Sequence, residues 1–386
     1  MITLQQKFDM FIILRYLNIH KKFTFSPQNI QIYLHNYECG EMIYMKKYFV
    51  FLMTIIMLCG CTHNKQYDKD FQVGFIITTE KKKDSDIVYL DNDLNEIYRQ
   101  NEKLPTLGDS MNIPMIKDGK MTLVPNGLYL DNNEQKVTSL DFKTGKLETY
   151  DVPKFNILNA IIKNDYIYTL NNSNGIEYLT LSDKKGHIIK EITDKDYIMT
   201  EILDYNDKIL VFKSINNEEH IKSYICVYDL NLHLIKEINI SDYGYSQSKA
   251  IIHNHKLYFV NSSDNNHSIG ILDLDNEQLE KIELDMIPNE IAIFKNKLYV
   301  SSGIHSQPGN KICIIQLDDR KMKIVKVNTF IDKMISNQDG IYTMYSEDGK
   351  IDIRKYDLDS CKELNKATFQ YDSNTPYYPS VLFSNQ

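Results

Sequence analysis

The chain has 386 residues and a formal net charge of −8, with 27 tyrosines, no tryptophan and six cysteines. The negative balance argues against nucleic acid as a partner, because binding to nucleic acid relies on clustered cations that neutralise phosphates. Cys226, Cys313 and Cys361 are spaced too irregularly for a disulfide framework or a zinc knuckle, so we expect buried free thiols within strands.

Residues 45–60 carry the marks of a secretion signal. Lys46 and Lys47 precede an apolar run that ends in Leu58-Cys59-Gly60-Cys61. These last four residues resemble the end of bacterial lipoprotein signal peptides, which are cleaved just before a cysteine that then carries lipid. The resemblance implies lipidation of Cys61. The alternative is an uncleaved transmembrane helix, but a span needs about 20 apolar residues, whereas residues 48–60 supply 13.

The 44 residues before this signal need a separate explanation. Signals of this kind stand at an N-terminus, so residues 1–44 are either a true extension or a leader, with translation beginning at Met45. Gly40-Glu41 back-translates to a purine-rich sequence that could bind the ribosome upstream of Met45. We therefore predict that residues 1–44 are a mis-assigned leader without a fold of their own.

Residues 61–70 are predicted to be a polar tether, and residues 71–386 to form the folded domain. Six basic and three acidic residues precede Cys61, so the chain from Cys61 onward holds 38 basic and 49 acidic side chains. Together, the signal and the tether predict a protein anchored through Cys61 to the outer, extracytoplasmic face of the cell membrane.

A short apolar strand that closes on an aspartate recurs along the folded domain. The seven aspartates, 39 to 50 residues apart, are Asp91, Asp141, Asp183, Asp229, Asp273, Asp318 and Asp357. Each later unit also has a polar turn followed by an aliphatic residue and usually an aromatic one, as at Leu257-Tyr258 and Leu298-Tyr299. Alternating apolar and polar residues between turns rich in Asn, Asp and Gly predict four short strands in each unit.

Four-stranded units of this length are typical of the blades of a β-propeller. The first unit begins with residues 73–80 and lacks an innermost strand, while Tyr377 to Ser384 is a spare strand at the C-terminus. We therefore predict an all-β fold, a seven-bladed β-propeller closed by a C-terminal strand that completes the first blade. Six or eight blades also fit, because residues 104–120 do not align with any strand of the repeated unit.

The repeat pattern resembles the superfamily of seven-bladed bacterial propellers that includes the YVTN-repeat and quinoprotein-like proteins. The closest local match is LDFKTGKL, residues 140–147, which looks like the turn between the outer two strands in those families. Quinoprotein propellers typically pack a tryptophan between blades, and this chain has none. The resemblance therefore implies the fold, and no cofactor is predicted.

One polar position recurs at the start of the predicted innermost strands. Counting back eight residues from the aliphatic residue of each second strand gives Lys120, Asn159, Glu201, Lys249, Glu290 and Lys333. We expect this ring at one rim of the central channel, where convergent polar groups suit a polar or charged small ligand. The competing interpretation is that these residues, which alternate in sign from Glu201 onward, neutralise one another.

The sequence contains no GxSxG, HExxH or GxxxxGK[ST] pattern, and no catalytic residue is predicted. His253 and His255 are spaced like metal ligands on a strand, but other units have ordinary turn residues there, and no metal is predicted. A hydrolase similar to the lactonase-type enzymes of the superfamily would need Asn159, Glu201 and Glu290 to hold a divalent cation. The interleaved Lys249 and Lys333 argue against it, because ammonium groups repel a cation.

We therefore expect a non-catalytic binding or interaction module, attached to the membrane through lipid on Cys61. Its partner is an unidentified protein or a small polar ligand. The alternatives that stay open are the metal-dependent hydrolase on the same fold and a scaffold in envelope assembly.

Overall fold

The computed structural model describes residues 67, 70–79, 84–108, 111, 113–125, 135–217, 220–244, 248–261, 266–304, 307–371 and 377–385. The predicted leader (1–44), the signal (45–60) and Cys61 lie outside the described residues, and of the tether (61–70) the structure describes Tyr67 and Asp70. Among the described residues, no helix is long and apolar enough to cross a membrane.

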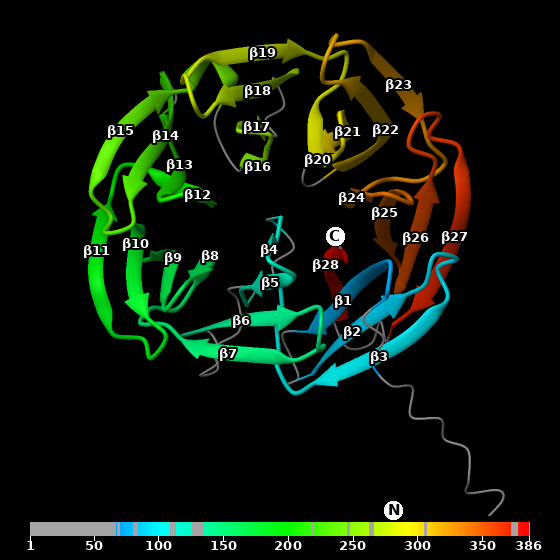
Figure 1. Cartoon of the computed structure of the whole chain (residues 1–386), viewed down its shortest axis with the longest axis horizontal. Helices are drawn as coiled ribbons and strands as arrows, with labels where there is room; N and C mark the ends of the chain where they lie inside the picture. Colours follow the sequence, from blue (N-terminus) through cyan, green and yellow to red (C-terminus); the bar gives the residue numbers. More distant parts are fainter. Residues whose placement is uncertain are drawn as a thin grey trace, which may run out of the picture. The chain divides into compact units, whose positions relative to one another are not determined.

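The described residues form a ring of seven antiparallel sheets, each with four strands (Figure 1). From the channel outward, blade 1 consists of β28 (Tyr377–Ser384), β1 (Val73–Thr79), β2 (Ser85–Leu90) and β3 (Glu96–Glu102). Blade 2 consists of β4 (Met115–Lys117), β5 (Lys120–Leu123), β6 (Lys136–Asp141) and β7 (Leu147–Asp151). Blade 3 consists of β8 (Ile157–Lys163), β9 (Tyr166–Ser173), β10 (Ile176–Asp183) and β11 (Ile188–Asp194).

The other four blades repeat this order. Blade 4 consists of β12 (Ile198–Tyr205), β13 (Lys208–Asn217), β14 (His220–Asp229) and β15 (Leu234–Asn239), followed by the 3-10 turn η2 (Ser241–Tyr243). Blade 5 consists of β16 (Ser248–His253), β17 (Lys256–Asn261), β18 (Ser268–Asp273) and β19 (Leu279–Glu283). Blade 6 consists of β20 (Pro288–Phe294), β21 (Lys297–Ile304), β22 (Gln307–Gln316) and β23 (Met322–Lys326), and blade 7 of β24 (Lys333–Asn337), β25 (Gly340–Glu347), β26 (Lys350–Tyr356) and β27 (Glu363–Gln370).

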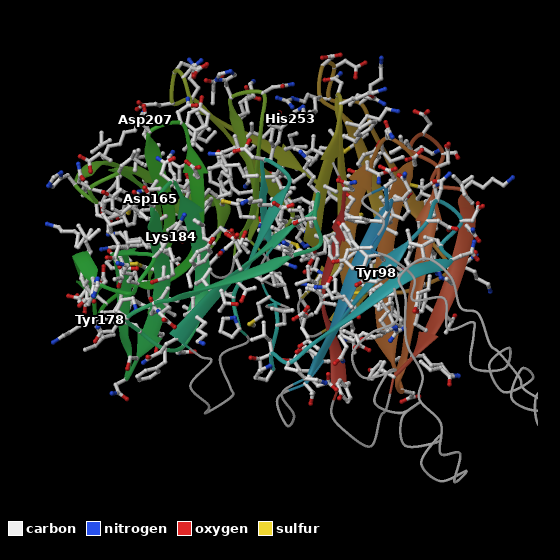
Figure 2. The ribbon with its side chains drawn as sticks, turned by 60° about the horizontal axis from the view of Figure 1, so that its bottom comes forward. Tyr98, Asp165, Tyr178, Lys184, Asp207 and His253 are labelled. Carbon is white, nitrogen blue, oxygen red and sulfur yellow. The ribbon has the colours of Figure 1, made fainter. Side chains whose placement is uncertain are left out.

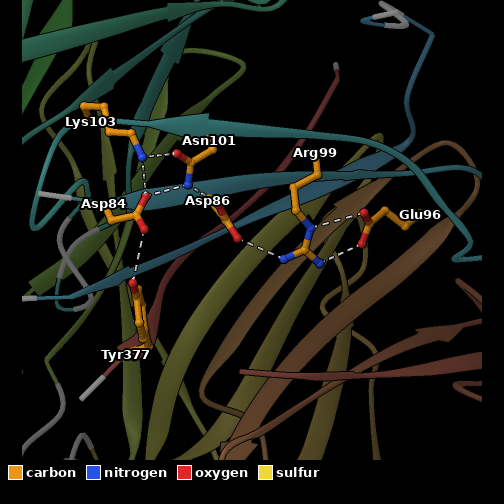
Figure 3. Close-up of polar contacts among 7 residues, drawn as sticks. All are labelled: Asp84, Asp86, Glu96, Arg99, Asn101, Lys103 and Tyr377. Carbon is orange, nitrogen blue, oxygen red and sulfur yellow. Dashed lines mark hydrogen bonds and ion pairs between the residues drawn. The ribbon is translucent and has the colours of Figure 1, made fainter. Parts of the chain in front are cut away.

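The C-terminal strand closes the ring, as the sequence predicts. β28 pairs antiparallel with β1, so that Ser384 lies opposite Val73 and Tyr377 opposite Thr79 (Figure 1). At the start of β28, the Tyr377 hydroxyl donates to Asp84 Oδ2 at 3.3 Å, within a polar network that also reaches β3 (Figure 3). The predicted all-β fold with seven blades is confirmed.

Apolar packing between neighbouring blades holds the described ring together. Each of its seven junctions contains one cluster of buried apolar side chains. Tyrosines of the second strands take part: the hydroxyl of Tyr168 donates to the Leu230 carbonyl at 2.8 Å, and that of Tyr299 to the Leu358 carbonyl at 3.1 Å. Each hydrogen bond crosses to the next blade. The aromatic rings of these tyrosines are therefore buried while their hydroxyl groups keep a hydrogen-bond partner.

The repeated aspartates have a structural role in the turn between the third and fourth strands. Asp183 Oδ1 accepts the backbone N–H groups of Lys185 and His187, each at 2.9 Å. The equivalent aspartates that accept two turn N–H groups in this way are Asp91, Asp141, Asp229, Asp273 and Asp357. Blade 6 differs, since Asp319 rather than Asp318 accepts a turn N–H there. A short carboxylate satisfies backbone donors that the turn leaves unpaired.

We predict that two of these aspartates contribute to acid sensitivity. The backbone N–H and the imidazole of His187 hold the pKa of Asp183 at about 2, and His233 lowers the pKa of Asp229 in the same way. A carboxylate with a lowered pKa stabilises the fold above its ordinary pKa, and this stabilisation is lost as the pH falls through the folded-state pKa.

Exchange of Asp183 and Asp229 for Asn should therefore flatten the decline in the free energy of unfolding between about pH 4 and pH 2. Urea denaturation at a series of pH values measures this decline. An identical slope in the wild type and the double variant would contradict the assignment.

Candidate functional site

Five of the six predicted rim residues lie on innermost strands. Asn159 is on β8, Glu201 on β12 and Lys249 on β16. Glu290 is on β20 and Lys333 begins β24. All five are at most 9% exposed, although four of them carry a charge in water. Buried charges are tolerated only where partners compensate for the lost hydration.

The placement of Lys120 on an innermost strand is wrong. Asp118 and Gly119 have positive φ values and form the turn between β4 and β5, so that Lys120 begins the second strand of blade 2. Its side chain is about half exposed, with Nζ 3.9 Å from Asp141 Oδ2. The prediction failed because it counted back from Leu128, which lies outside the described residues, whereas the innermost strand of this blade is only three residues long.

The buried rim residues contact one another from blade to blade. Asn159 Nδ2 donates to Glu201 Oε1 at 2.5 Å between blades 3 and 4. The ammonium of Lys249 forms an ion pair with Glu290 between blades 5 and 6. The Lys249–Glu290 pair is of the kind that the neutralisation interpretation expects, whereas Asn159 carries no charge that could neutralise Glu201.

Irregular strand pairing directs three of these side chains to the rim. The register of β8 with β9 shifts between Ile157 and Asn159, and that of β12 with β13 shifts between Met199 and Glu201. A third shift, between Pro288 and Ile291, includes Glu290. An extra residue in one strand changes which way the following side chains point. The polar residues therefore occupy positions that a regular strand would give to their neighbours.

Asp332 is a member of the rim cluster that sequence reasoning missed. It immediately precedes β24, and its Oδ2 accepts the Ser346 backbone N–H at 2.9 Å. Burial raises the pKa of the Asp332 carboxyl, while the Ser346 hydrogen bond and the ammonium groups of Lys333 and Lys249 oppose this rise. The two ammonium groups thus offset part of the cost of burying the Asp332 carboxyl. The only signal in the sequence was the charge directly beside Lys333.

Part of the segment 104–120, which did not align with the repeated unit, lies inside the ring. Met115 of β4 packs against the apolar clusters on both sides of blade 4, and Ile113 packs against the cluster between blades 5 and 6. Figure 1 shows β4 within the channel. At its end, Lys117 pairs with Asp204 of β12, and Lys163 Nζ lies 2.6 Å from the other oxygen of the same carboxylate. The protein's own side chains therefore occupy space that a small channel ligand would need.

The remaining candidate groups are the possible metal ligands and the cysteines. Among the described residues, no three or more His, Cys, Asp or Glu side chains are grouped as metal ligands. His253 ends β16 at the face of the ring that carries the turns between first and second strands (Figure 2). Cys226 and Cys313 are buried free thiols within β14 and β22, as predicted, whereas Cys361 is buried in the turn between β26 and β27. Burial raises the pKa of Cys226 and Cys361 to about 12 and that of Cys313 to about 11.

No protein-family model and no curated protein matches the chain. Among solved structures, it is similar to the dihydro-heme d1 dehydrogenase NirN in complex with DHE, with 12% identity and a TM-score of 0.50 over 83% of this chain and 76% of that chain. BamB from Moraxella catarrhalis gives 13% identity and a TM-score of 0.45 over 82% and 94%. Apo AztD from Citrobacter koseri gives 12% identity and a TM-score of 0.45 over 82% and 99%. At these identities, the similarity to NirN shows the β-propeller fold alone.

We predict that the Lys249–Glu290 pair stabilises the ring only while both partners are present. Lys249→Met should lower the free energy of unfolding by about 3 to 5 kcal/mol, because it leaves a buried carboxylate without its ammonium partner. Adding Glu290→Leu should recover much of this loss.

Urea denaturation measures both effects, and Lys120→Met is the control. That exposed residue should change the stability by no more than about 0.5 kcal/mol. Equal losses from Lys249→Met and Lys120→Met would overturn the structural assignment of the pair.

Proposed function

We propose that this protein is a non-catalytic interaction module, held at the outer face of the cell membrane by lipid on Cys61, that binds a protein partner on the wall of its propeller. The observation that carries the proposal is the contrast between the channel and the outer wall. At the rim, polar side chains are engaged with one another, and Met115 and Ile113 pack inside the ring. On the wall, aliphatic side chains are exposed.

The exposed aliphatic side chains stand in pairs on the outermost strands of two neighbouring blades. Ile188 and Ile189 on β11 are 50% and 52% exposed, and Leu234 and Ile235 on β15 are 51% and 52% exposed (Figure 1). Outer strands also present an unpaired edge, which favours contact with another chain. Grouped apolar residues on a surface are typical of protein interaction sites. These features support a protein rather than a small molecule as the partner.

The membrane part of the proposal rests on the sequence of the signal. Lys46, Lys47 and the apolar run before Cys61 fit a cleaved lipoprotein signal. A cysteine that carries two acyl chains would hold the protein firmly, because stable anchoring takes two hydrophobic groups.

Photo-crosslinking in intact cells tests the partner surface. A photoreactive amino acid at Ile189 or Leu234 should yield one crosslinked protein species, and Ile235→Asp should remove most of it. The matched control is Leu364 on β27, which is 54% exposed on a different part of the wall. Equal yields at Leu364 and Ile189, or yields indifferent to Ile235→Asp, would contradict the proposed surface.

A second experiment tests the anchor. Cys61→Ser should release the protein from the membrane fraction and remove the mass of the lipid, because the modified thiol is gone. Cys59→Ser is the matched control, since bulky Leu58 before Cys59 disfavours modification there, and it should leave both readouts unchanged. Fractionation and mass spectrometry measure the outcome. A Cys61→Ser protein with unchanged mass and membrane retention would exclude lipidation at this residue.

A further inference from the structure

Tyr67 is fixed to the propeller at the junction of blades 1 and 2. Its ring makes edge contacts with Tyr89 and Tyr98, at centroid distances of 5.2 and 5.7 Å. Its hydroxyl donates a hydrogen bond to the Phe142 carbonyl in the turn between β6 and β7. Contacts of this kind with two blades at once define one position for the residue.

The turn between β6 and β7 in blade 2 leaves room for the aromatic ring of Tyr67. Gly145 has φ +69°, and a Cβ atom placed on it would lie 2.7 Å from Cγ and Cδ2 of Tyr67. Only a residue without a side chain allows the ring to lie so close. The Gly145 carbonyl also accepts a hydrogen bond from Gln100 Nε2 of β3 at 3.0 Å, so the receiving turn is itself tied to blade 1.

The length of chain before Tyr67 limits how far the propeller can stand from a lipid anchor. Six peptide steps separate Tyr67 from Cys61. A fully extended chain advances at most about 3.6 Å per residue, so these steps span no more than about 22 Å. Because Tyr67 contacts the propeller, we count the reach of the chain from Cys61 to this residue.

Charge also differs between two equivalent turns on opposite sides of the ring. The blade 2 turn that holds Tyr67 carries the exposed Lys143 and Lys146. Blade 5 lies across the ring (Figure 1), and its equivalent turn carries the exposed Asp275 and Glu277, the latter paired with Lys236. A membrane surface with anionic lipids attracts exposed lysines and repels carboxylates.

We propose that the junction of blades 1 and 2 faces an anionic lipid bilayer, with Tyr67 as the positioning residue that sets this orientation and blade 5 turned away. This inference rests on the proposed lipid anchor at Cys61. In this orientation the exposed wall of blades 3 and 4 faces sideways, so that a protein partner can reach it.

Depth-dependent fluorescence quenching tests the orientation. The lipid-modified protein is reconstituted in vesicles of phosphatidylethanolamine and phosphatidylglycerol that contain lipids with spin-labelled headgroups. A fluorescent amino acid stands either at Thr149 or at Lys281, the exposed third residues of β7 and β19. Quenching at Thr149 should exceed quenching at Lys281 several-fold.

Two variants of Tyr67 separate the inference from the anchor. Tyr67→Phe keeps the aromatic ring and should keep most of the difference between the two labels, whereas Tyr67→Ala should reduce the difference while the vesicle-bound fraction stays the same. Melting temperatures verify that both variants are folded. Equal quenching of the two labels in the vesicle-bound wild type, or a difference that Tyr67→Ala leaves unchanged, would overturn this inference alone. Absence of the wild-type protein from the vesicles would overturn the anchor and the inference together.

Discussion

The antiparallel pairing of β28 with β1 is the constraint on which the remaining structure depends. Because the C-terminal strand completes the first blade, every blade has a neighbour on both sides, and each described junction can bury an apolar cluster. A ring without this strand would leave the inner edge of β1 unpaired. Closure also completes the ring of innermost strands around the channel.

Once the ring is closed, charge at the rim must be compensated. Lys249 and Glu290 come from different blades and form a buried ion pair, in which each charge compensates for the lost hydration of the other. Such pairs add little net stability compared with apolar residues, but they disfavour arrangements that separate the partners. The side chains of Met115 and Ile113 add apolar packing from within the ring. These buried residues of the innermost strands are thus part of the structural core.

The repeat in the sequence was sufficient to predict the architecture and to place five polar residues on innermost strands. The aspartate spacing reflects a turn that depends on one side chain, so it could be read without coordinates, and the extra strand at Tyr377–Ser384 followed from counting units. The irregular pairing before Asn159 and Glu201 could not be predicted, because the register shift depends on how each strand pairs with its neighbour, and the sequence of one strand does not specify that pairing. The path of β4 depends on contacts with blades 3 to 6. Lys120 was misplaced because the innermost strand of its blade is only three residues long, and Asp332 was missed because it falls one residue before the recurring polar position.

The buried cysteines have a chemical consequence for how the domain responds to oxidants. Only the thiolate form of cysteine reacts readily with oxidants, disulfides or alkylating reagents. With pKa values of about 11 to 12, Cys226, Cys313 and Cys361 hold almost no thiolate at neutral pH. Their burial therefore keeps these three sulfur atoms inert toward oxidants and disulfides, and the domain holds its shape without a disulfide bond among them.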